Sequence, residues 1–376
     1  MAALSASHYI GLMSGTSLDG VDAVLAQFDT QGRPTVIARA TSPFEPALRN
    51  ALFSLNTSGP DELARAALAA NQLANVYATL VAQTLKQAQL AAHQISAIGA
   101  HGQTVRHQPA LGYTIQLNAP ALLAELTGIS VIADFRSRDV AAGGQGAPLV
   151  PVFHAGIFST NYTRVILNLG GIANITILRP EADPVGFDTG PANALMDSWC
   201  QLHTQQSFDA DGAWGAQGCA HTPLLERLIS SEPWLKQPPP KSTGRDLFNL
   251  AWLEPRLQYC LGRLEPGQTL TPQDIQATLC RFTVETAVQS ILAQAPEVQE
   301  VLVCGGGAHN QALLQGLKAA LPCPVLTTDS AGVGTQDVEA LAFAWLAWAH
   351  QHGVAAGNPK VTGARGARIL GASWPA

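Results

Sequence analysis

Short apolar runs alternate with polar, glycine-containing turns along the chain, and this alternation predicts a mixed α/β protein. Residues 9–14 and 21–28 are two predicted strands joined by the turn SGTSLDG, and residues 35–44 are a third. Residues 61–92, rich in Ala, Leu and Gln, are a predicted helix. Further strands are expected within residues 95–105, 113–118 and 129–135, with a short helix at 120–126. A meander followed by helical crossovers is typical of an α/β domain.

The second half of the chain repeats the opening pattern in outline. A passage rich in Gly and Pro, residues 139–151, predicts a linker or an active-site loop. Residues 164–178 are again a strand, a polar glycine turn and a strand, so each hairpin is expected to begin a domain of similar size. The pattern continues with a strand and helix at 184–200, a polar surface excursion at 234–249, a helix at 272–294, strands at 300–304 and 324–329, and a closing helix at 336–350.

Local signals predict where two of these helices begin. Thr271 is the expected N-cap of helix 272–294, because Pro272 suits a first turn and Asp274 is stabilised by the helix dipole. Thr335 is the expected cap of the closing helix, which carries Asp337 and Glu339 in its first turn.

Composition limits the classes of function. A chain of 376 residues that is 47% hydrophobic and 13% charged predicts two domains with large interiors. The net charge of -6 and the absence of a Lys/Arg-rich run argue against a nucleic-acid partner. None of the six cysteines forms a CxxC pair, so reduced thiols in a cytoplasmic protein are expected. We see no signal-peptide pattern, and the most apolar stretch, residues 340–349, is about half a membrane span, so no membrane partner is expected.

Three glycine-rich turns follow predicted strands: SGTSLDG, NLGGIANIT and CGGGAHN. Turns that direct several backbone amides at one point bind phosphate, and glycine lets the ligand approach closely. Ordinary hairpin turns are the alternative for any one of them. The P-loop, G-x-G-x-x-G and G-x-S-x-G motifs are absent. The residues alone therefore indicate a two-domain phosphotransferase that holds ATP with turns from both domains.

Seven motifs together resemble one family along nearly the whole chain. They are GLMSGTSLDGVD, GAHGQTVRH, AAGGQGAPLVP, NLGGIANIT, FDTGPAN, CGGGAHN and VEALAFAWLA, in this order. They resemble the anhydro-N-acetylmuramic acid kinases, within the sugar kinase, heat-shock-70 and actin superfamily. The resemblance implies two ribonuclease-H-like α/β domains of the actin/hexokinase-like ATPase fold with a central cleft. The expected domains are residues 1–138 plus 352–376, and residues 139–351.

The same resemblance implies an activity and its catalytic residues. Such a kinase uses ATP to open the ring of 1,6-anhydro-N-acetylmuramic acid and phosphorylate O6, which is a step of peptidoglycan recycling. Asp188 would be the base that deprotonates water; capping the next helix is the alternative. Glu339 would contact the sugar; a solvated glutamate is the alternative. One base without an opposing acid departs from ordinary glycoside hydrolysis, so the γ-phosphate is expected to capture the leaving oxygen.

ATP and Mg²⁺ are the expected cofactors. The first turn would line the phosphates through backbone amides or hydroxyls, with the residues Ser14, Gly15, Thr16, Ser17, Leu18, Asp19, Gly20, Val21 and Asp22. Asp19 and Asp22 would hold Mg²⁺ through its waters. The second and third turns would contact phosphate and adenosine through Gly170, Gly171, Gly305, Gly306, Gly307 and Asn310.

The sugar contacts are expected in the first half of the chain. Gln103 and Thr104 would bond sugar hydroxyls or the lactyl carboxylate, and Gln145 with Gly146 would reach the N-acetyl group. Arg136 would pair the carboxylate as a bidentate fork; a surface arginine is the alternative. His101 and His107 have no third ligand in the pattern, so packed or hydrogen-bonded histidines are expected rather than a metal site.

Three readings of the whole protein stay open at this point. The first is the anhydro-sugar kinase, expected as a homodimer, with helix 342–349 as core or dimer interface. The second is a superfamily kinase for another small sugar or acid. The third is a nucleotide-switched ATPase that is not an enzyme of metabolism.

Overall fold

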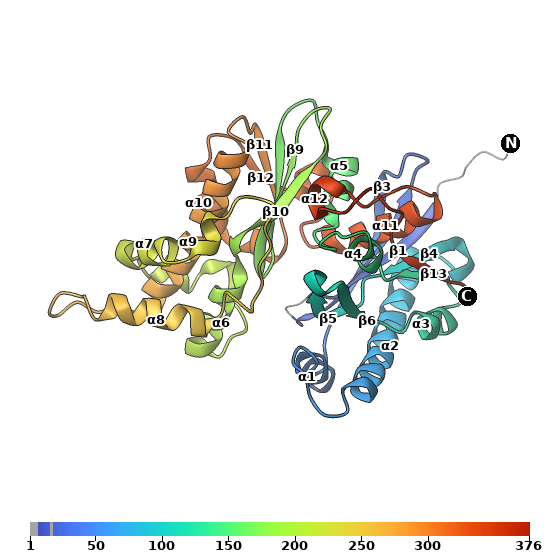
Figure 1. Cartoon of the computed structure of the whole chain (residues 1–376), viewed down its shortest axis with the longest axis horizontal. Coiled ribbons are helices and arrows are strands. Elements are labelled where there is room, and N and C mark those ends of the chain that lie inside the picture. The colour runs from blue at the N-terminus through green and yellow to red at the C-terminus, as the bar shows by residue number, and fades with distance from the viewer. Residues whose placement is uncertain (1–6, 16–17) are drawn as a thin grey trace. The chain divides into compact units, whose positions relative to one another are not determined.

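The computed structural model describes residues 7–15 and 18–376 (Figure 1). The chain divides into two compact units. Unit 1 is Met1–Ile157 with Asp337–Ala376, and unit 2 is Phe158–Gln336. The expected boundaries are corrected at two places, because residues 139–157 and 337–351 belong to unit 1. Asp139 accepts a hydrogen bond from Thr362 Oγ1 at 2.8 Å, which ties the first of these segments to the C-terminal part of the chain.

Unit 1 contains a six-stranded sheet in the order β13-β7-β4-β1-β2-β3. Its strands are β1 (Ser7–Met13), β2 (Gly20–Phe28), β3 (Pro34–Pro43), β4 (Ile95–Ala100), β7 (Val131–Ala133) and β13 (Ala372–Trp374). β1, β2 and β3 are an antiparallel meander, whereas β4 pairs parallel with β1 and with β7. A separate hairpin consists of β5 (Gln103–Gln108) and β6 (Tyr113–Leu117).

The α-helices of unit 1 include four that the sequence pattern did not predict, namely α1, α4, α5 and α12 in the following list. They are α1 (Pro46–Ser54), α2 (Glu62–Ala88), α3 (Pro120–Thr127), α4 (Ser137–Ala141), α5 (Val150–Phe158), α11 (Val338–Gln351) and α12 (Pro359–Thr362). α1 was not expected, and the predicted helix 61–92 ends at Ala88 because Gln89 takes the left-handed conformation. The Gly/Pro-rich passage expected as a linker or loop thus contains the end of α4 and the start of α5.

Two glycines let α11 lie close against the sheet. Gly11 of β1 and Gly99 of β4 are register partners. A Cβ at Gly11 would overlap the carbonyl oxygen of Ala340, and one at Gly99 would overlap that of Phe343. The alternate residues of β1 belong instead to the core on the α2 side. α11 is buried from Val338 to Ala349 except at Glu339, so it is part of the core of unit 1.

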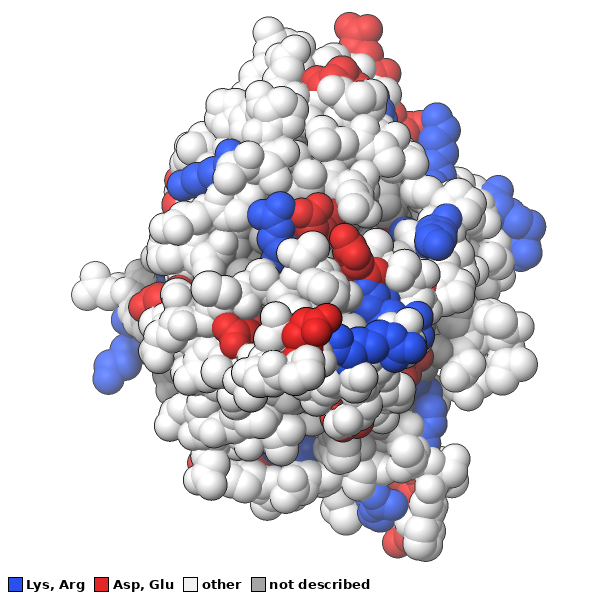
Figure 2. Space-filling view, turned by 90° about the vertical axis from the view of Figure 1, so that its left-hand side faces the viewer, with Lys and Arg blue, Asp and Glu red and all other residues white. Residues whose placement is uncertain are grey.

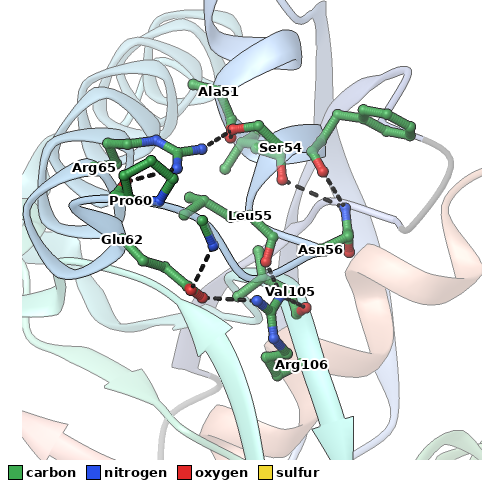
Figure 3. A network of polar contacts seen from close by, with 12 residues as sticks. Ala51, Ser54, Leu55, Asn56, Pro60, Glu62, Arg65, Val105 and Arg106 are labelled. Atoms are coloured by element: carbon green, nitrogen blue, oxygen red, sulfur yellow. Dashed lines mark hydrogen bonds and ion pairs between the residues drawn. The ribbon is translucent and has the colours of Figure 1, made fainter.

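A polar network fastens the hairpin strand β5 to the helices beside it (Figure 3). Arg106 of β5 forms an ion pair with Glu62 at 2.7 Å and also donates to the carbonyl of Leu55, just after α1. Arg65 of α2 donates to Ser54 Oγ and to Pro60 O. These contacts fix the strand whose first two residues, Gln103 and Thr104, are expected sugar contacts.

Unit 2 repeats the strand order of unit 1. Its strands are β8 (Arg164–Leu169), β9 (Ile172–Leu178), β10 (Val185–Pro191), β11 (Glu300–Cys304) and β12 (Val325–Thr327), in the order β10-β9-β8-β11-β12. In both units an antiparallel meander is followed by two parallel strands. The prediction of two ribonuclease-H-like α/β units is confirmed.

The α-helices of unit 2 share one hydrophobic core with its sheet. They are α6 (Asn193–Thr204), α7 (Thr222–Ser230), α8 (Leu250–Leu261), α9 (Pro272–Gln294) and α10 (Gln311–Ala320). The short 3-10 helices of the chain are η1 (Ala92–Gln94), η2 (Pro109–Leu111), η3 (Ala210–Gly212), η4 (Gly215–Gln217), η5 (Pro233–Lys236), η6 (Gly306–His309) and η7 (Thr328–Ala331). α9 begins as predicted, with Thr271 Oγ1 accepting from Asp274 N in a capping box.

The surface and the helices agree with the composition. On the face drawn in Figure 2, Lys and Arg side chains are interspersed with Asp and Glu among many uncharged residues. Over residues 7–15 and 18–376, no helix is both long and apolar enough to cross a membrane.

Candidate active site

The first glycine turn and the start of α11 line one pocket in unit 1. The pocket has a volume of about 290 Å³ and is lined by Met13, Gly15, Asp19, Gly20, Asp22, Thr41, Ser42, Pro43 and Glu339. Four expected nucleotide residues and one expected catalytic residue are therefore brought together. Thr16 and Ser17, also expected there, lie outside the described residues.

Of the described residues in the turn between β1 and β2, Ser14 and Leu18 are buried and Asp19 is exposed. Leu18 takes a positive φ of 59°, and its amide donates to Gly15 O at 3.2 Å. The hydroxyl of Ser14 points inward, within 3.1 Å of both Tyr77 Oη and Gly102 O. Val21 is fully buried in the core. The inward-pointing hydroxyl of Ser14 and the buried side chain of Val21 favour contact with a phosphate through backbone amides, which was one of the two expected modes.

Gly20 has a structural explanation of its own. A Cβ at Gly20 would overlap the carbonyl oxygen of Ser42 on the neighbouring strand β3. Glycine is therefore required here by strand pairing, with or without a bound phosphate.

Carboxylates gather at the pocket and suit a hard cation. Burial raises the pKa of Asp22, a hydrogen bond from Thr41 opposes that rise, and the charges of Asp337 and Asp19 add to it. A cation would relieve this repulsion, and carboxylate oxygen is the ligand type that Mg²⁺ prefers. Among the described residues, no group of three His, Cys, Asp or Glu side chains is placed to hold a metal directly. The residues therefore fit a Mg²⁺ held through water and phosphate oxygens.

Arg136 lies just before α4 in a polar environment below the surface. Its Nη1 donates to Gly146 O at 2.8 Å, and its Nε and Nη2 lie 3.2 and 3.0 Å from His101 Nε2. Burial lowers the pKa of Arg136 to about 10, against the opposing influence of Glu339 and Asp139. The guanidinium is therefore charged at neutral pH, and the alternative of a surface arginine is wrong.

The other expected sugar residues fall into two groups. Gln103 is buried, and its Nε2 donates to Gly15 O at 3.1 Å. Its Oε1 is buried and has no hydrogen-bond partner among the described residues, so it is free to accept from a ligand hydroxyl. Thr104 instead accepts from Gln116 at 3.2 Å. The loop of Gln145 and Gly146 is held by Thr362 O and by Asp139 Oδ2, with the side chain of Gln145 exposed.

Glu339 is half-buried and lies in the first turn of α11, lining the pocket. The helix begins later than predicted, at Val338, and Asp337 stands at the N-cap position, so the prediction of Thr335 as the cap is wrong. Thr335 belongs to unit 2, where its carbonyl accepts from Gly305 N at 2.9 Å.

Asp188 lies in β10 of unit 2, and its carboxylate is held on one side only. Oδ2 accepts from Ser242 Oγ and from Thr243 N, both at 2.9 Å. Within residues 7–15 and 18–376 no hydrogen bond is directed at Oδ1. Burial raises the pKa of Asp188 to about 6, although Thr243, Ser242 and Lys241 lower it. The N-cap of α6 is Ala192, so the alternative in which Asp188 caps that helix is wrong.

The segment Lys241–Arg245 was missed by the sequence reasoning, which described it as a surface excursion. It supplies both donors to Asp188, and Lys241 O accepts from Asp188 N at 3.1 Å. The guanidinium of Arg245 lies beside Gly171, within 3.4 Å of where a Cβ would be. Hydroxyl residues and a glycine directly after a run of prolines, in PPPKSTGRD, were the available signal.

The second turn is hydrogen-bonded to the start of α6 and has open space at Gly170. Gly170 O and Gly171 O accept from the amides of Asn193 and Ala192 at the start of α6, each at 3.0 Å. A Cβ at Gly170 would have no atom nearer than 3.6 Å. The turn therefore leaves space above Gly170 and has the cation of Arg245 next to it.

The third turn combines structural glycines with an open one. A Cβ at Gly305 would overlap Asn168, and one at Gly307 would lie 2.6 Å from Leu169 Cβ. At Gly306 the nearest atom is Asn193 Nδ2, at 4.0 Å. Asn310 Oδ1 caps α10 by accepting from Ala312 N and Leu313 N. The protein's own atoms therefore leave room for a side chain at 306.

Beside this turn, unit 2 has a second pocket of about 120 Å³, and its lining residues include Asn310, Gln276, Cys280 and Gly212. Gln276 is buried, and its Oε1 has no hydrogen-bond partner among the described residues. Burial raises the pKa of the Cys280 thiol to about 12, so the thiol is neutral.

The sequence matches one family of known proteins along almost its whole length. The family model for anhydro-N-acetylmuramic acid kinase matches residues 7–376. A protein of Bordetella petrii named anhydro-N-acetylmuramic acid kinase is 59% identical over 98% of this chain and 96% of its own. One of Chromobacterium violaceum with the same name is 51% identical, over 98% and 99%. The chain belongs to the anhydro-N-acetylmuramic acid kinase family.

Solved structures resemble the chain only distantly. A ROK family glucokinase from Streptomyces griseus, in complex with glucose and AMPPNP, is 13% identical over 90% of this chain and 98% of its own, with a TM-score of 0.40. Component A of the (R)-2-hydroxyglutaryl-CoA dehydratase of Acidaminococcus fermentans is 12% identical over 90% and 96%, with a TM-score of 0.46. Because both TM-scores are below 0.5, membership of the anhydro-N-acetylmuramic acid kinase family rests on the sequence matches alone.

Proposed function

We propose that the protein is an ATP-dependent kinase that opens the ring of 1,6-anhydro-N-acetylmuramic acid with water and phosphorylates O6. The products are N-acetylmuramic acid 6-phosphate and ADP, and the process served is peptidoglycan recycling. The observation that carries the proposal is the Asp188 carboxylate. This carboxylate is half-buried, accepts two hydrogen bonds at Oδ2 and has its pKa raised to about 6 by burial. The chain that carries it belongs to the anhydro-N-acetylmuramic acid kinase family.

The chemistry needs a base but no second carboxylic acid. The oxygen of water bonds to the anomeric carbon, C1, while the bond from C1 to the bridging oxygen breaks. That oxygen, now O6, bonds to the γ-phosphorus as the bond from phosphorus to ADP breaks. Asp188 takes the proton of water at Oδ1. With a pKa of about 6, the carboxylate is mostly ionised at neutral pH and still basic enough to accept that proton.

Residues of each unit would bind the nucleotide. The β1–β2 turn and Gly170–Gly171 would offer backbone amides to the phosphates, with Arg245 as a nearby cation. Mg²⁺ would be held through its waters by Asp19 and Asp22, and it would balance charge on the transferred phosphoryl group.

The adenine base would enter the second pocket of unit 2. Gln276 Oε1, buried without a partner, would accept from the exocyclic amino group, and the ribose would pass over Gly306. This proposal is supported by the open position at Gly306 and by the pocket that Asn310 of the same turn helps to line.

The sugar would be bound by unit 1. Arg136 is charged and oriented, so it would pair the lactyl carboxylate, while Gln103 Oε1 would accept from a hydroxyl. Glu339 and the loop of Gln145 and Gly146 would contact the rest of the ring, with Thr104 held back by Gln116. A homodimer and a cytoplasmic location complete the proposal; light scattering that gives the mass of one chain would contradict the dimer.

The proposal is tested by coupled ADP release and by isotope labelling. ADP release is expected with 1,6-anhydro-N-acetylmuramic acid, and not with N-acetylglucosamine or without sugar. In H₂¹⁸O, the product should carry label at C1 and none in the phosphoester, with unlabelled product in the same water as the exchange control. Turnover without sugar would favour the nucleotide-switched ATPase. Turnover of another sugar only would favour a different superfamily kinase.

A further inference from the structure

The hydrogen bonds of His101 define its tautomer. Arginine has only donors, so His101 Nε2, which lies 3.2 and 3.0 Å from Arg136 Nε and Nη2, must be an acceptor without a proton. The remaining proton of the neutral ring is then on Nδ1, which lies 3.3 Å from the carbonyl oxygen of Ser14. A carbonyl oxygen only accepts, so both ring nitrogens have partners of the correct type.

The surroundings keep this ring neutral and in place. His101 is 4% exposed, and burial, with the charge of Arg136, holds its pKa well below the ordinary range. Its ring packs on Phe343 with centroids 4.6 Å apart. Phe343 lies one helical turn after Glu339 on α11, so the same histidine touches the helix that presents Glu339.

His101 therefore joins segments that are far apart in the sequence. Through Ser14 O it contacts the end of β1, where the proposed phosphate turn begins. Through Nε2 it contacts Arg136, the residue before α4. Arg136 in turn donates to Gly146 O. Of the five N–H groups of the guanidinium, His101 and Gly146 engage three, which leaves one on each terminal nitrogen. Two such N–H groups are what a bidentate carboxylate requires.

We propose that His101 is a positioning residue, whose neutral imidazole fixes the orientation in which Arg136 meets the carboxylate of the sugar. This inference rests on the proposed function. His101 does not touch the reacting atoms; it acts through Arg136, and it couples the sugar contact to the turn proposed to bind phosphate. A histidine that only fills space would need neither hydrogen bond.

Two substitutions separate the roles of the two ring nitrogens. In His101→Asn the amide nitrogen takes the place of Nδ1, so the bond to Ser14 O is kept and the acceptor for Arg136 is lost. In His101→Gln the amide oxygen takes the place of Nε2, so the acceptor is kept. His350→Asn is the matched control, because His350 Nδ1 also lies near a carbonyl oxygen, that of Leu370, at 2.9 Å. His350 lies at the C-terminal end of α11, and Glu339 lies in the first turn of that helix.

The Michaelis constants for sugar and for ATP are measured for each variant. His101→Asn should raise KM for 1,6-anhydro-N-acetylmuramic acid about tenfold, with kcat and KM for ATP changed less than about threefold. His101→Gln should stay within about threefold of the wild type. For 1,6-anhydro-N-acetylglucosamine, which lacks the carboxylate, His101→Asn should leave KM, or Ki if it is not turned over, unchanged.

Other outcomes overturn the inference. Equal losses in His101→Asn and His101→Gln, or equal effects on both sugars, would leave His101 a packing residue. Wild-type kinetics in His101→Asn would do the same. Nitrogen-15 chemical shifts of the His101 ring report its tautomer without turnover. A proton on Nε2 would refute the positioning role of His101 and leave the proposed function untouched. A wild-type protein that does not turn over the carboxylate sugar would refute the proposed function and, with it, the substrate named here.

Discussion

At the scale of single residues, Asp188 is the proposed catalytic base, and its replacement by asparagine is the most direct test. Asp188→Asn keeps the shape and an oxygen that can accept from Ser242 and Thr243, but it cannot take a proton. We expect kcat to fall by a factor of at least about 10² and the Kd for ATP to stay unchanged. Asp329→Asn, at an exposed position of η7, is the control. Asp188→Asn with more than a tenth of wild-type kcat would show that another group is the base.

The pKa of Asp188 also predicts the pH dependence of the reaction. The base must be ionised, so log kcat/KM should fall below about pH 6 with a slope near one as Asp188 becomes protonated. The hydroxyl of Ser242 donates to the carboxylate and lowers its pKa. Ser242→Ala should therefore raise this pKa and move the acidic limb to higher pH. Ser330→Ala, an exposed serine of η7, should leave the limb in place, and a Ser242→Ala profile identical to wild type would contradict the assignment.

Residue identities were easier to predict than residue partners. Asp188, Arg136 and Gln103 were selected from motifs that are contiguous in the sequence. Their environments come from elsewhere: Ser242 and Thr243 lie 54 and 55 positions from Asp188, and His101 lies 35 positions from Arg136. Such contacts depend on the fold, so the sequence could not show that Asp188 is not a cap, or that Arg136 is not a surface arginine.

At the scale of elements, the third glycine turn contains glycines needed for packing and one, Gly306, that is proposed to lie against a ligand. Gly306→Ala has room, since the nearest atom to the new Cβ is 4.0 Å away, so the melting temperature should change little. If adenosine passes over this position, the Kd for ATP should rise about tenfold through overlap with the ligand. Differential scanning fluorimetry and calorimetric titration measure the two effects.

Gly307→Ala is the matched variant. Its Cβ would lie 2.6 Å from Leu169 Cβ, so overpacking should destabilise the fold by about 1–3 kcal/mol. A Gly306→Ala protein that binds ATP like the wild type would place the nucleotide elsewhere.

Elements with local signals were predicted well, and those without them were not. The predicted bounds of helix 272–294 are confirmed at both ends. Its start was marked in the sequence by a capping threonine, a proline and an aspartate. The turn after β1 was located from its glycines and polar residues. α1 was missed because nine residues carry little periodicity, and Thr335 was misassigned because a threonine before an acidic turn resembles a cap. Capping is decided by where the helix packs, and α11 is positioned by Gly11 and Gly99 of the sheet.

At the scale of the whole molecule, the repeated hairpin pattern correctly indicated two units of one topology, but it misplaced their boundaries. The sheet of unit 1 is completed by the last strand of the chain, β13, and covered by α11. Chain order cannot reveal that a helix which follows unit 2 packs on the first unit. In the structure, the close approach of α11 to Gly11 and Gly99 places this helix against the sheet of unit 1.

The proposal that residues of both units bind one Mg-ATP has a measurable consequence for the whole protein. A ligand at about 100 times its Kd stabilises the folded state by about 2.7 kcal/mol, and a tenfold weaker ligand at the same concentration by about 1.4 kcal/mol. Asp19→Asn in unit 1 and Gly306→Ala in unit 2 should both show the smaller stabilisation, while melting like the wild type without nucleotide. Removing Mg²⁺ with EDTA should abolish the difference between Asp19→Asn and wild type, because Asp19 is proposed to act through the metal. It should leave the Gly306→Ala deficit. If only one of the two variants weakens the response to Mg-ATP, the nucleotide is bound by that unit alone.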